Sequence, residues 1–177
     1  MPVVPLVPLV SLVSAMITLL ASVLVPPSPP CLLAPVEAPI VDPYRDPRCV
    51  WCPGNRGLTY GTAPGASVRA AAAGTVAFSG VVAGTRYVVV QHADGVRATY
   101  GGLEVTDLRA GDPVVAGGVI GRSAGELHFG LRRGDAYLDP TPLIGRLVER
   151  RRLVPTDGTP ARTGPPPRLR CAASGTG

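Results

Sequence analysis

Short apolar runs with glycine between them dominate the middle of this chain. In the last run Leu127, Phe129 and Leu131 alternate with polar or small residues, so an extended strand there has one apolar face. Most intervals between runs are too short for the crossover helices that parallel strands need. The pattern therefore predicts an all-β domain, a small antiparallel sheet or sandwich. The runs cover residues 67–73, 75–82, 86–91, 114–120 and 126–132.

Two of these segments carry the signature of a β-hairpin. Residues 86–91 include the run Tyr-Val-Val-Val, and residues 96–100 alternate apolar and polar side chains. Ala93-Asp94-Gly95, which lies between them, is a tight-turn sequence. We predict a hairpin over residues 86–100.

A short C-terminal helix is expected to close the domain. Asp139 and Pro140 are suited to the N-cap and the first turn, and Leu143 and Leu147 fall on one face. The basic cluster at residues 150–152 would complement the negative end of the helix dipole. The predicted helix runs to about residue 150.

Low-complexity segments flank this domain. Residues 1–25 contain no charged side chain and are rich in Val and Leu, which predicts an export helix, either a cleaved signal peptide or a membrane anchor. Residues 26–47 are punctuated by proline and are predicted to be an extended tether. The Pro/Gly/Arg-rich residues 151–177 are predicted to be disordered. This leaves residues 48–150 as one domain outside the cytoplasm, in the cell envelope, with membrane contact only through the N-terminal segment.

The net charge of +5 comes from arginine alone, because the chain contains no lysine. Aromatic residues make up only 5% of the chain, and arginines do not alternate with aromatic platforms as in single-strand binding proteins. No nucleic-acid partner is therefore expected.

Four cysteines follow the predicted export segment, so disulfides are expected. Cys49 and Cys52 have the spacing of a redox pair, of half a zinc knuckle, or of a structural clip around Trp51. The chain lacks the βαβ pattern of a thioredoxin and the second ligand pair of a knuckle, which favours the clip. Cys31 and Cys171 could pair with each other, with the clip cysteines or with a partner.

An ordered series of motifs resembles the lysostaphin/LytM-type zinc endopeptidases of peptidoglycan. Residues 55–59, Asn-Arg-Gly-Leu-Thr, stand where that family has His-x-Gly-x-Asp. Residues 126–130, Glu-Leu-His-Phe-Gly, stand where it has His-Leu-His-Phe-Glu. Further landmarks lie between these motifs, in order: Pro64-Gly65, Gly74-Thr75-Val76, Thr99-Tyr100 followed by Leu103, and Ala110-Gly111-Asp112. The resemblance implies a small antiparallel β domain with a groove.

The resemblance also implies that zinc would be held at positions 55, 59 and 128, with catalytic histidines at 102 and 126. These positions are Asn55, Thr59, His128, Gly102 and Glu126, so only His128 is retained. Catalytic zinc needs three nitrogen, sulfur or carboxylate ligands and an open position for water. A neutral amide and a hydroxyl are poor zinc ligands. We expect a degenerate member without catalytic residues and without a bound cofactor.

The favoured hypothesis is a non-catalytic domain that binds peptidoglycan or regulates a cell-wall hydrolase. Trp51 and Arg56 are the binding candidates at the groove edge. We expect His128 to hydrogen-bond Glu126 or Thr59 in a polar groove.

The alternative hypothesis is an active zinc metalloendopeptidase that cleaves peptidoglycan cross-bridges. Its rearranged site would combine His128 and Glu126, which share a strand face, with a third donor. That donor would be Asp94 or the Cys49/Cys52 pair, since His92 is expected to lie outside, beside the hairpin turn.

Overall fold

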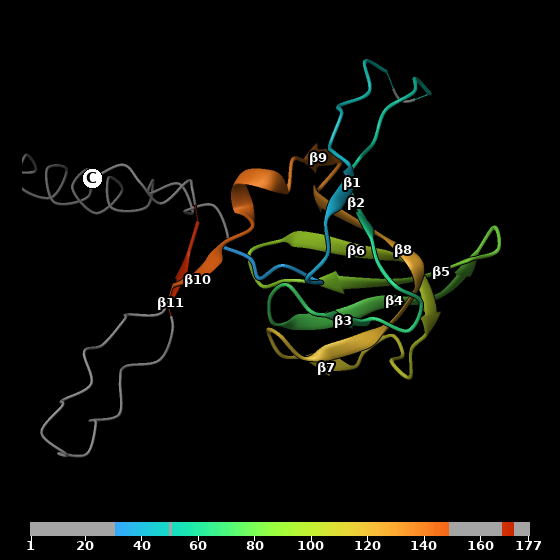
Figure 1. Ribbon diagram of the computed structural model, residues 1–177, viewed down its shortest axis with the longest axis vertical. Coiled ribbons are helices and arrows are strands. Elements are labelled where there is room, and N and C mark those ends of the chain that lie inside the picture. The colour runs from blue at the N-terminus through green and yellow to red at the C-terminus, as the bar shows by residue number, and fades with distance from the viewer. Residues whose placement is uncertain (1–30, 50, 149–167, 172–177) are drawn as a thin grey trace, which may run out of the picture.

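The computed structural model of the chain describes residues 31–49, 51–148 and 168–171 (Figure 1). In these ranges nearly all of the regular secondary structure is strand, so the predicted all-β fold class is confirmed. None of the described helices is long and apolar enough to cross a membrane. The predicted export segment, residues 1–25, lies outside the described residues, as does most of the predicted tail. The elements are β1 (Ile40–Asp42), β2 (Leu58–Gly61), β3 (Ser67–Arg69), β4 (Gly74–Val82), β5 (Thr85–Gln91), β6 (Val96–Val105), β7 (Pro113–Val114), β8 (Val119–Arg133), β9 (Ala136–Leu138), the 3₁₀ turn η2 (Thr141–Leu143), β10 (Arg146–Val148) and β11 (Arg168–Arg170).

One antiparallel sheet is organised around the long strand β8. Its strands follow the order β1-β2-β8-β6-β5-β4-β7, and β3 and β9 also pair with β8. The register places Thr59 of β2 opposite His128 and Gly101 of β6 on the other side of the same histidine. The two resembling motifs therefore lie on adjacent strands.

The predicted hairpin is present as β5 and β6. Gln91 pairs with Arg97 next to the turn, and the pairing continues to Arg86 and Leu103. Gly95 adopts a φ of +82°, which only glycine reaches without strain, and the Asp94 carboxylate accepts a hydrogen bond from the Val96 N–H at 3.1 Å. The turn sequence and the strand pattern thus act together.

The core lies on the sheet face predicted from the alternation in β8. Leu127, Phe129 and Leu131 are buried there, and the ring of Tyr100 lies 5.2 Å from that of Phe129. The Tyr100 hydroxyl is satisfied inside the core, because it accepts a hydrogen bond from the Ala71 N–H at 2.8 Å.

The predicted tether is wrong for residues 31–42, which pack against the domain. Leu32 is 1% exposed, and its N–H donates to the Leu143 carbonyl at 2.8 Å. Val36 is buried too, and β1 joins the sheet beside β2. These residues contact the domain at irregular intervals between prolines. Their buried side chains therefore do not show the periodicity that marks a helix or strand.

The predicted closing helix is also wrong. It is reduced to the single turn η2, and β10 follows where the helix was expected to continue. Asp139 does accept a hydrogen bond from the Thr141 N–H at 2.9 Å, but Gly145 follows within one turn and disfavours helix continuation. Residues 168–170 form β11, which pairs with β10, so this part of the predicted disordered tail is ordered.

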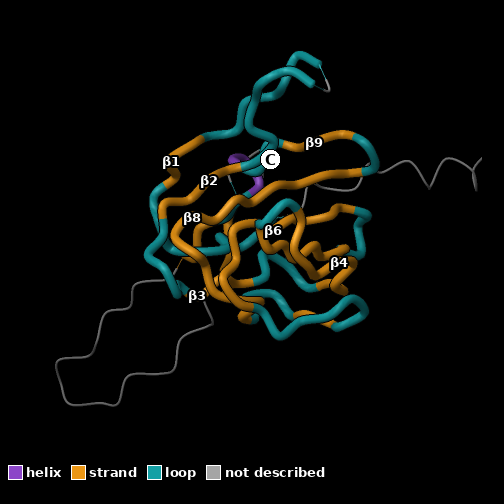
Figure 2. Tube along the Cα trace, turned by 90° about the vertical axis from the view of Figure 1, so that its right-hand side faces the viewer, coloured by secondary structure: helices purple, strands orange, loops and turns teal. Residues whose placement is uncertain are grey.

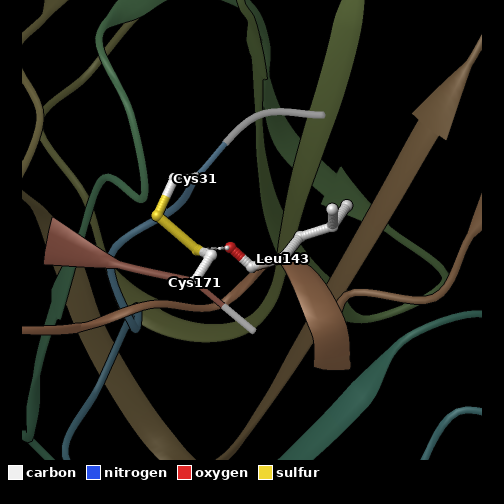
Figure 3. The surroundings of a disulfide bond; sticks show 3 residues. All are labelled: Cys31, Leu143 and Cys171. Atoms are coloured by element: carbon white, nitrogen blue, oxygen red, sulfur yellow. Dashed lines mark hydrogen bonds between the residues drawn. A yellow bond between two sulfur atoms is a disulfide. The ribbon is translucent and has the colours of Figure 1, made fainter. Parts of the chain in front are cut away.

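A disulfide joins the two flanks of the domain. Cys31 bonds to Cys171 across 140 residues, with the Cα atoms 5.7 Å apart. The Cys171 sulfur lies 2.9 Å from the carbonyl oxygen of Leu143 (Figure 3). Because a disulfide sulfur carries no proton, this is a sulfur–oxygen contact. The bond closes the domain at the point where η2 ends.

Candidate functional site

The five positions implied by the motif resemblance gather around the middle of β8. Thr59 and His128 are directly opposite in the β2–β8 pair, and Glu126 lies opposite Gly61. Asn55 precedes β2 and is buried. A Cβ atom on Gly102 would lie 2.2 Å from the Glu126 carbonyl oxygen, which is too close for any side chain. Gly102 also has a φ of +82°. The five positions therefore lie near one another on neighbouring segments, and at Gly102 no side chain fits.

Asn55 is held by an acidic residue that the sequence reasoning missed. Its amide N–H group donates to the carboxylate of Asp42 at 3.0 Å and to the Asp42 carbonyl at 3.1 Å. Arg45 forms an ion pair with the same carboxylate. Its backbone also exchanges two hydrogen bonds of 2.9 Å with Asn55. The N-terminal segment thus packs directly against the first motif.

The charges in this network shift two pKa values. The hydrogen bond from Arg45 holds the pKa of Asp42 below its usual 3.8. Burial lowers the pKa of His128 below its usual 6.5, and the negative charge of Asp42 opposes that shift. At neutral pH the site therefore combines an ionised carboxylate, a guanidinium and a neutral imidazole.

The imidazole of His128 is packed between two glycines. A Cβ on Gly57 would lie 2.8 Å from its Cε1 atom, and one on Gly130 would lie 3.3 Å from Nε2. Among the described residues, neither Glu126 nor Thr59 forms a hydrogen bond with the imidazole, so that expectation is wrong. The ring is placed by close backbone approach.

The donor set does not fit the zinc ion that the family implies. Asn55 directs its N–H groups at Asp42, and Thr59 offers a neutral hydroxyl, which leaves His128 as the one strong donor at the three family positions. Asp42 is already bound by Arg45 and Asn55. Within residues 31–49, 51–148 and 168–171, no three His, Cys, Asp or Glu side chains are grouped so that they could hold a metal ion.

The additional donors considered for a rearranged site do not reach it. Cys49 and Cys52 form a disulfide, which confirms the predicted clip and removes their thiolates. Asp94 lies at the hairpin turn, 3.7 Å from the Arg133 guanidinium. His92 is buried rather than outside, because its Nδ1 atom lies 2.8 Å from the Ala73 carbonyl and its ring fills the space beside Gly74.

Two cavities that share Arg56 and Tyr137 lie between His128 and the clipped loop, and only the first is lined by His128. The first, called here the inner pocket, has a volume of about 260 Å³. The second, the outer groove, has a volume of about 590 Å³ and lies against the loop between β1 and β2, which projects beyond the sheet in both views (Figures 1 and 2). The inner pocket is lined by Arg56, Tyr87, Thr99, His128, Gly130, Leu131, Arg132 and Tyr137. The outer groove is lined by Asp46, Pro47, Cys49, Trp51, Arg56, Asp135, Ala136 and Tyr137.

Both binding candidates from the sequence lie on these cavities. Trp51 is 94% exposed and borders the outer groove, and Arg56 borders both cavities. Sequence reasoning missed Tyr137 and Arg132. The Tyr137 ring lies 5.4 Å from the Arg56 guanidinium carbon and 5.8 Å from that of Arg132, so two cations flank one aromatic ring.

Comparisons with known proteins place this fold. Residues 53–140 match the profile of peptidase family M23. An uncharacterized protein of Mycobacterium tuberculosis (strain H37Rv) is 37% identical over 107 residues, which are 53% of this chain and 43% of that protein. Helicobacter pylori Csd3 superposes with a TM-score of 0.59 at 26% identity, over 71% of this chain and 37% of the Csd3 chain. A chain of the SpoIIIAH–SpoIIQ complex gives a TM-score of 0.53 at 21% identity, over 62% of this chain and 96% of its own length.

The fold and the motif positions define a peptidase-type β domain in which most metal donors are replaced. The domain formed by residues 53–140 belongs to peptidase family M23, as a lysostaphin/LytM-type member without most zinc ligands. The match spans less than half the length of the M. tuberculosis relative. The likeness to the SpoIIIAH–SpoIIQ chain concerns the fold alone.

Proposed function

We propose that this chain is a non-catalytic M23 domain that acts at the cell wall, where it binds peptidoglycan or regulates a cell-wall hydrolase. The observation that carries the proposal is the network at Asn55. Its amide is directed at the carboxylate of Asp42, which in turn is paired with Arg45. Hydrogen bonds therefore satisfy the position where a zinc ligand would stand, and no open coordination site is built.

A second feature supports a role without catalysis. One catalytic histidine of the family corresponds to Gly102, where any Cβ would collide with the Glu126 carbonyl oxygen. The other corresponds to Glu126, an exposed carboxylate. A carboxylate can act as a general base, but Gly102 supplies no assisting side chain, so the metal donors and one assisting group are changed together.

The location and the type of partner are proposed from the disulfides and from the comparisons. Two disulfides suit an oxidising compartment, which favours a protein that is secreted or membrane-anchored with its domain outside the cytoplasm. A domain of this fold occurs in a complex of SpoIIIAH and SpoIIQ, so the fold is compatible with a role in protein association. Peptidoglycan is the ligand class implied by the family.

The proposal is tested by three measurements on the oxidised, purified chain. We expect zinc well below one ion per chain by elemental analysis, no lysis of cell-wall sacculi, and co-sedimentation with those sacculi. One zinc per chain together with chelator-sensitive lysis would instead establish the alternative, an active metalloendopeptidase. In that case His128→Ala should abolish both the bound zinc and the lysis.

A further inference from the structure

The inner pocket differs from the outer groove in charge. Among the described residues that line it, Arg56 and Arg132 carry guanidiniums and none carries a carboxylate. His128, which lines the same pocket, has a pKa lowered by burial and adds no full charge at neutral pH. The lining of the pocket therefore contains two guanidiniums, one of them paired with Asp135 outside the lining, around about 260 Å³, a space suited to one small anionic group.

The Tyr137 ring holds both guanidiniums beside this pocket. Arg56 and Arg132 lie 5.4 and 5.8 Å from the ring centroid, within the range of cation–π attraction. Arg132 also pairs with Asp135, whose side chain is fully exposed. A solvent-exposed ion pair contributes little to stability, so Arg132 can exchange this partner for a ligand at low cost.

The outer groove has a different composition that restricts the ligand. Asp46 and Asp135 line it, together with the aromatic surfaces of Trp51 and Tyr137. A polymer with a charge on every unit, such as a polyphosphate, would be repelled by these two carboxylates. A peptide whose carboxylates are separated by neutral or apolar groups matches the order of a cationic pocket followed by an aromatic groove.

We propose that the inner pocket binds a free carboxylate of a peptidoglycan stem peptide, and that the adjoining peptide runs past Tyr137 to Trp51. This inference rests on the proposed function and assigns it a ligand group. The planar guanidiniums of Arg56 and Arg132 match a carboxylate in geometry, and such charge-assisted bonds are about twice as strong as neutral ones. The chain thus recognises an anionic group of peptidoglycan, whereas a zinc-containing member of the family would bind the scissile carbonyl of the same polymer.

The test is calorimetric titration of the oxidised full chain with two synthetic probes. One is a stem tripeptide with free carboxylates, and the other is the same peptide with every carboxylate amidated. We expect the free acid to bind at least tenfold more tightly than the amide, with an affinity that falls as sodium chloride is raised from 50 to 500 mM. Equal affinities for the two probes would overturn the inference without any change to the protein.

Charge-removing variants locate the binding group. Arg56→Gln and Arg132→Gln are each expected to weaken binding of the free acid at least tenfold. Arg109→Gln, which removes the same charge from an exposed position away from both cavities, should leave binding within twofold. Far-UV circular dichroism and the unfolding midpoint verify that each variant is folded. Unchanged binding by both pocket variants would refute the assignment.

Further outcomes separate this inference from the proposed function. Co-sedimentation with sacculi that does not depend on Arg56 or Arg132 would overturn the carboxylate pocket and leave the cell-wall role standing. Binding of the free acid through these arginines, without binding to sacculi, would support the pocket and contradict the cell-wall role. Tight binding of a neutral chito-oligosaccharide, lost in Trp51→Ala and with no preference for the free acid, would assign the groove to glycan instead and overturn the inference.

Discussion

Removal of the Cys31–Cys171 disulfide should cost far more stability than removal of the Cys49–Cys52 disulfide. Both cross-links restrict the unfolded chain, but the first closes a loop with a sequence separation of 140 and the second a loop with a separation of 3. In the chain-entropy treatment these loops correspond to about 5 and about 2 kcal/mol of unfolding free energy at 25 °C. The predicted gap between the two variants is therefore about 3 kcal/mol.

Contacts next to the long cross-link add to this difference. Leu32, one residue after Cys31, is 1% exposed and hydrogen-bonded to Leu143 and Gly145 through its backbone. If loss of the bond releases this segment, exposure of one leucine side chain costs roughly another 1.5–3 kcal/mol. Trp51, inside the short cross-link, is already 94% exposed, so release of that loop exposes no comparable apolar side chain there.

Urea unfolding followed by far-UV circular dichroism measures the effect. The double variants Cys31→Ser/Cys171→Ser and Cys49→Ser/Cys52→Ser are compared with the oxidised parent chain, each at equilibrium. The long-loop variant should also show a larger dependence of unfolding free energy on urea, since its unfolded state is more expanded. Equal losses in the two variants, or a larger loss for the short loop, would refute the loop-entropy reasoning.

Two further predictions concern the site. Gly102→Ala should destabilise the fold by roughly 2–4 kcal/mol in urea unfolding, because its Cβ would meet the Glu126 carbonyl oxygen. The control Gly95→Ala, at the same φ of +82° but in open space, should cost only about 1–2 kcal/mol. Similar losses in the two variants would mean that contact with the Glu126 carbonyl is unimportant. The imidazole of His128 should titrate below 6.5 by NMR, and Asp42→Asn should lower its pKa further, because the Asp42 charge favours the imidazolium. Because the lowered pKa means that the unfolded chain binds the His128 proton more tightly than the folded chain, the stability of the parent chain should fall as the pH drops from about 7 through 6.5. His128→Gln should remove this loss. A His128 pKa that is unchanged in Asp42→Asn would contradict the coupling.

The central sheet was predictable from sequence because its contacts repeat with the period of a strand. Burial of Leu127, Phe129 and Leu131 leaves an alternation that is visible in a single chain, and the hairpin adds its own turn sequence. The order of motifs also located positions 59 and 128 on neighbouring strands. In both cases local pattern and tertiary packing agree.

The flanking segments were not predictable in this way, because their stability comes from contacts between distant residues. Leu32 is buried against the chain near Leu143, and β10 finds its partner β11 about 20 residues downstream. Neither interaction produces a periodic pattern in the segment itself. For the same reason Asp42, which completes the site, lay hidden in a segment that resembled a tether.

The electrostatics of the site show how hydrogen bonds and an ion pair stabilise the positions that hold zinc elsewhere in the family. Zinc in a site of this type supplies positive charge that its surrounding donors are arranged to meet. Here Arg45 supplies a positive charge instead, and it pairs with Asp42 while Asn55 donates to the same carboxylate. Replacement of Asn55 by histidine would remove that amide donor and bring a zinc ligand toward a carboxylate already committed to a guanidinium. Restored ligands at positions 55 and 59 alone would therefore compete with the Asp42–Arg45 ion pair, so the poor fit for zinc arises from the packing of the N-terminal segment as well as from the motif.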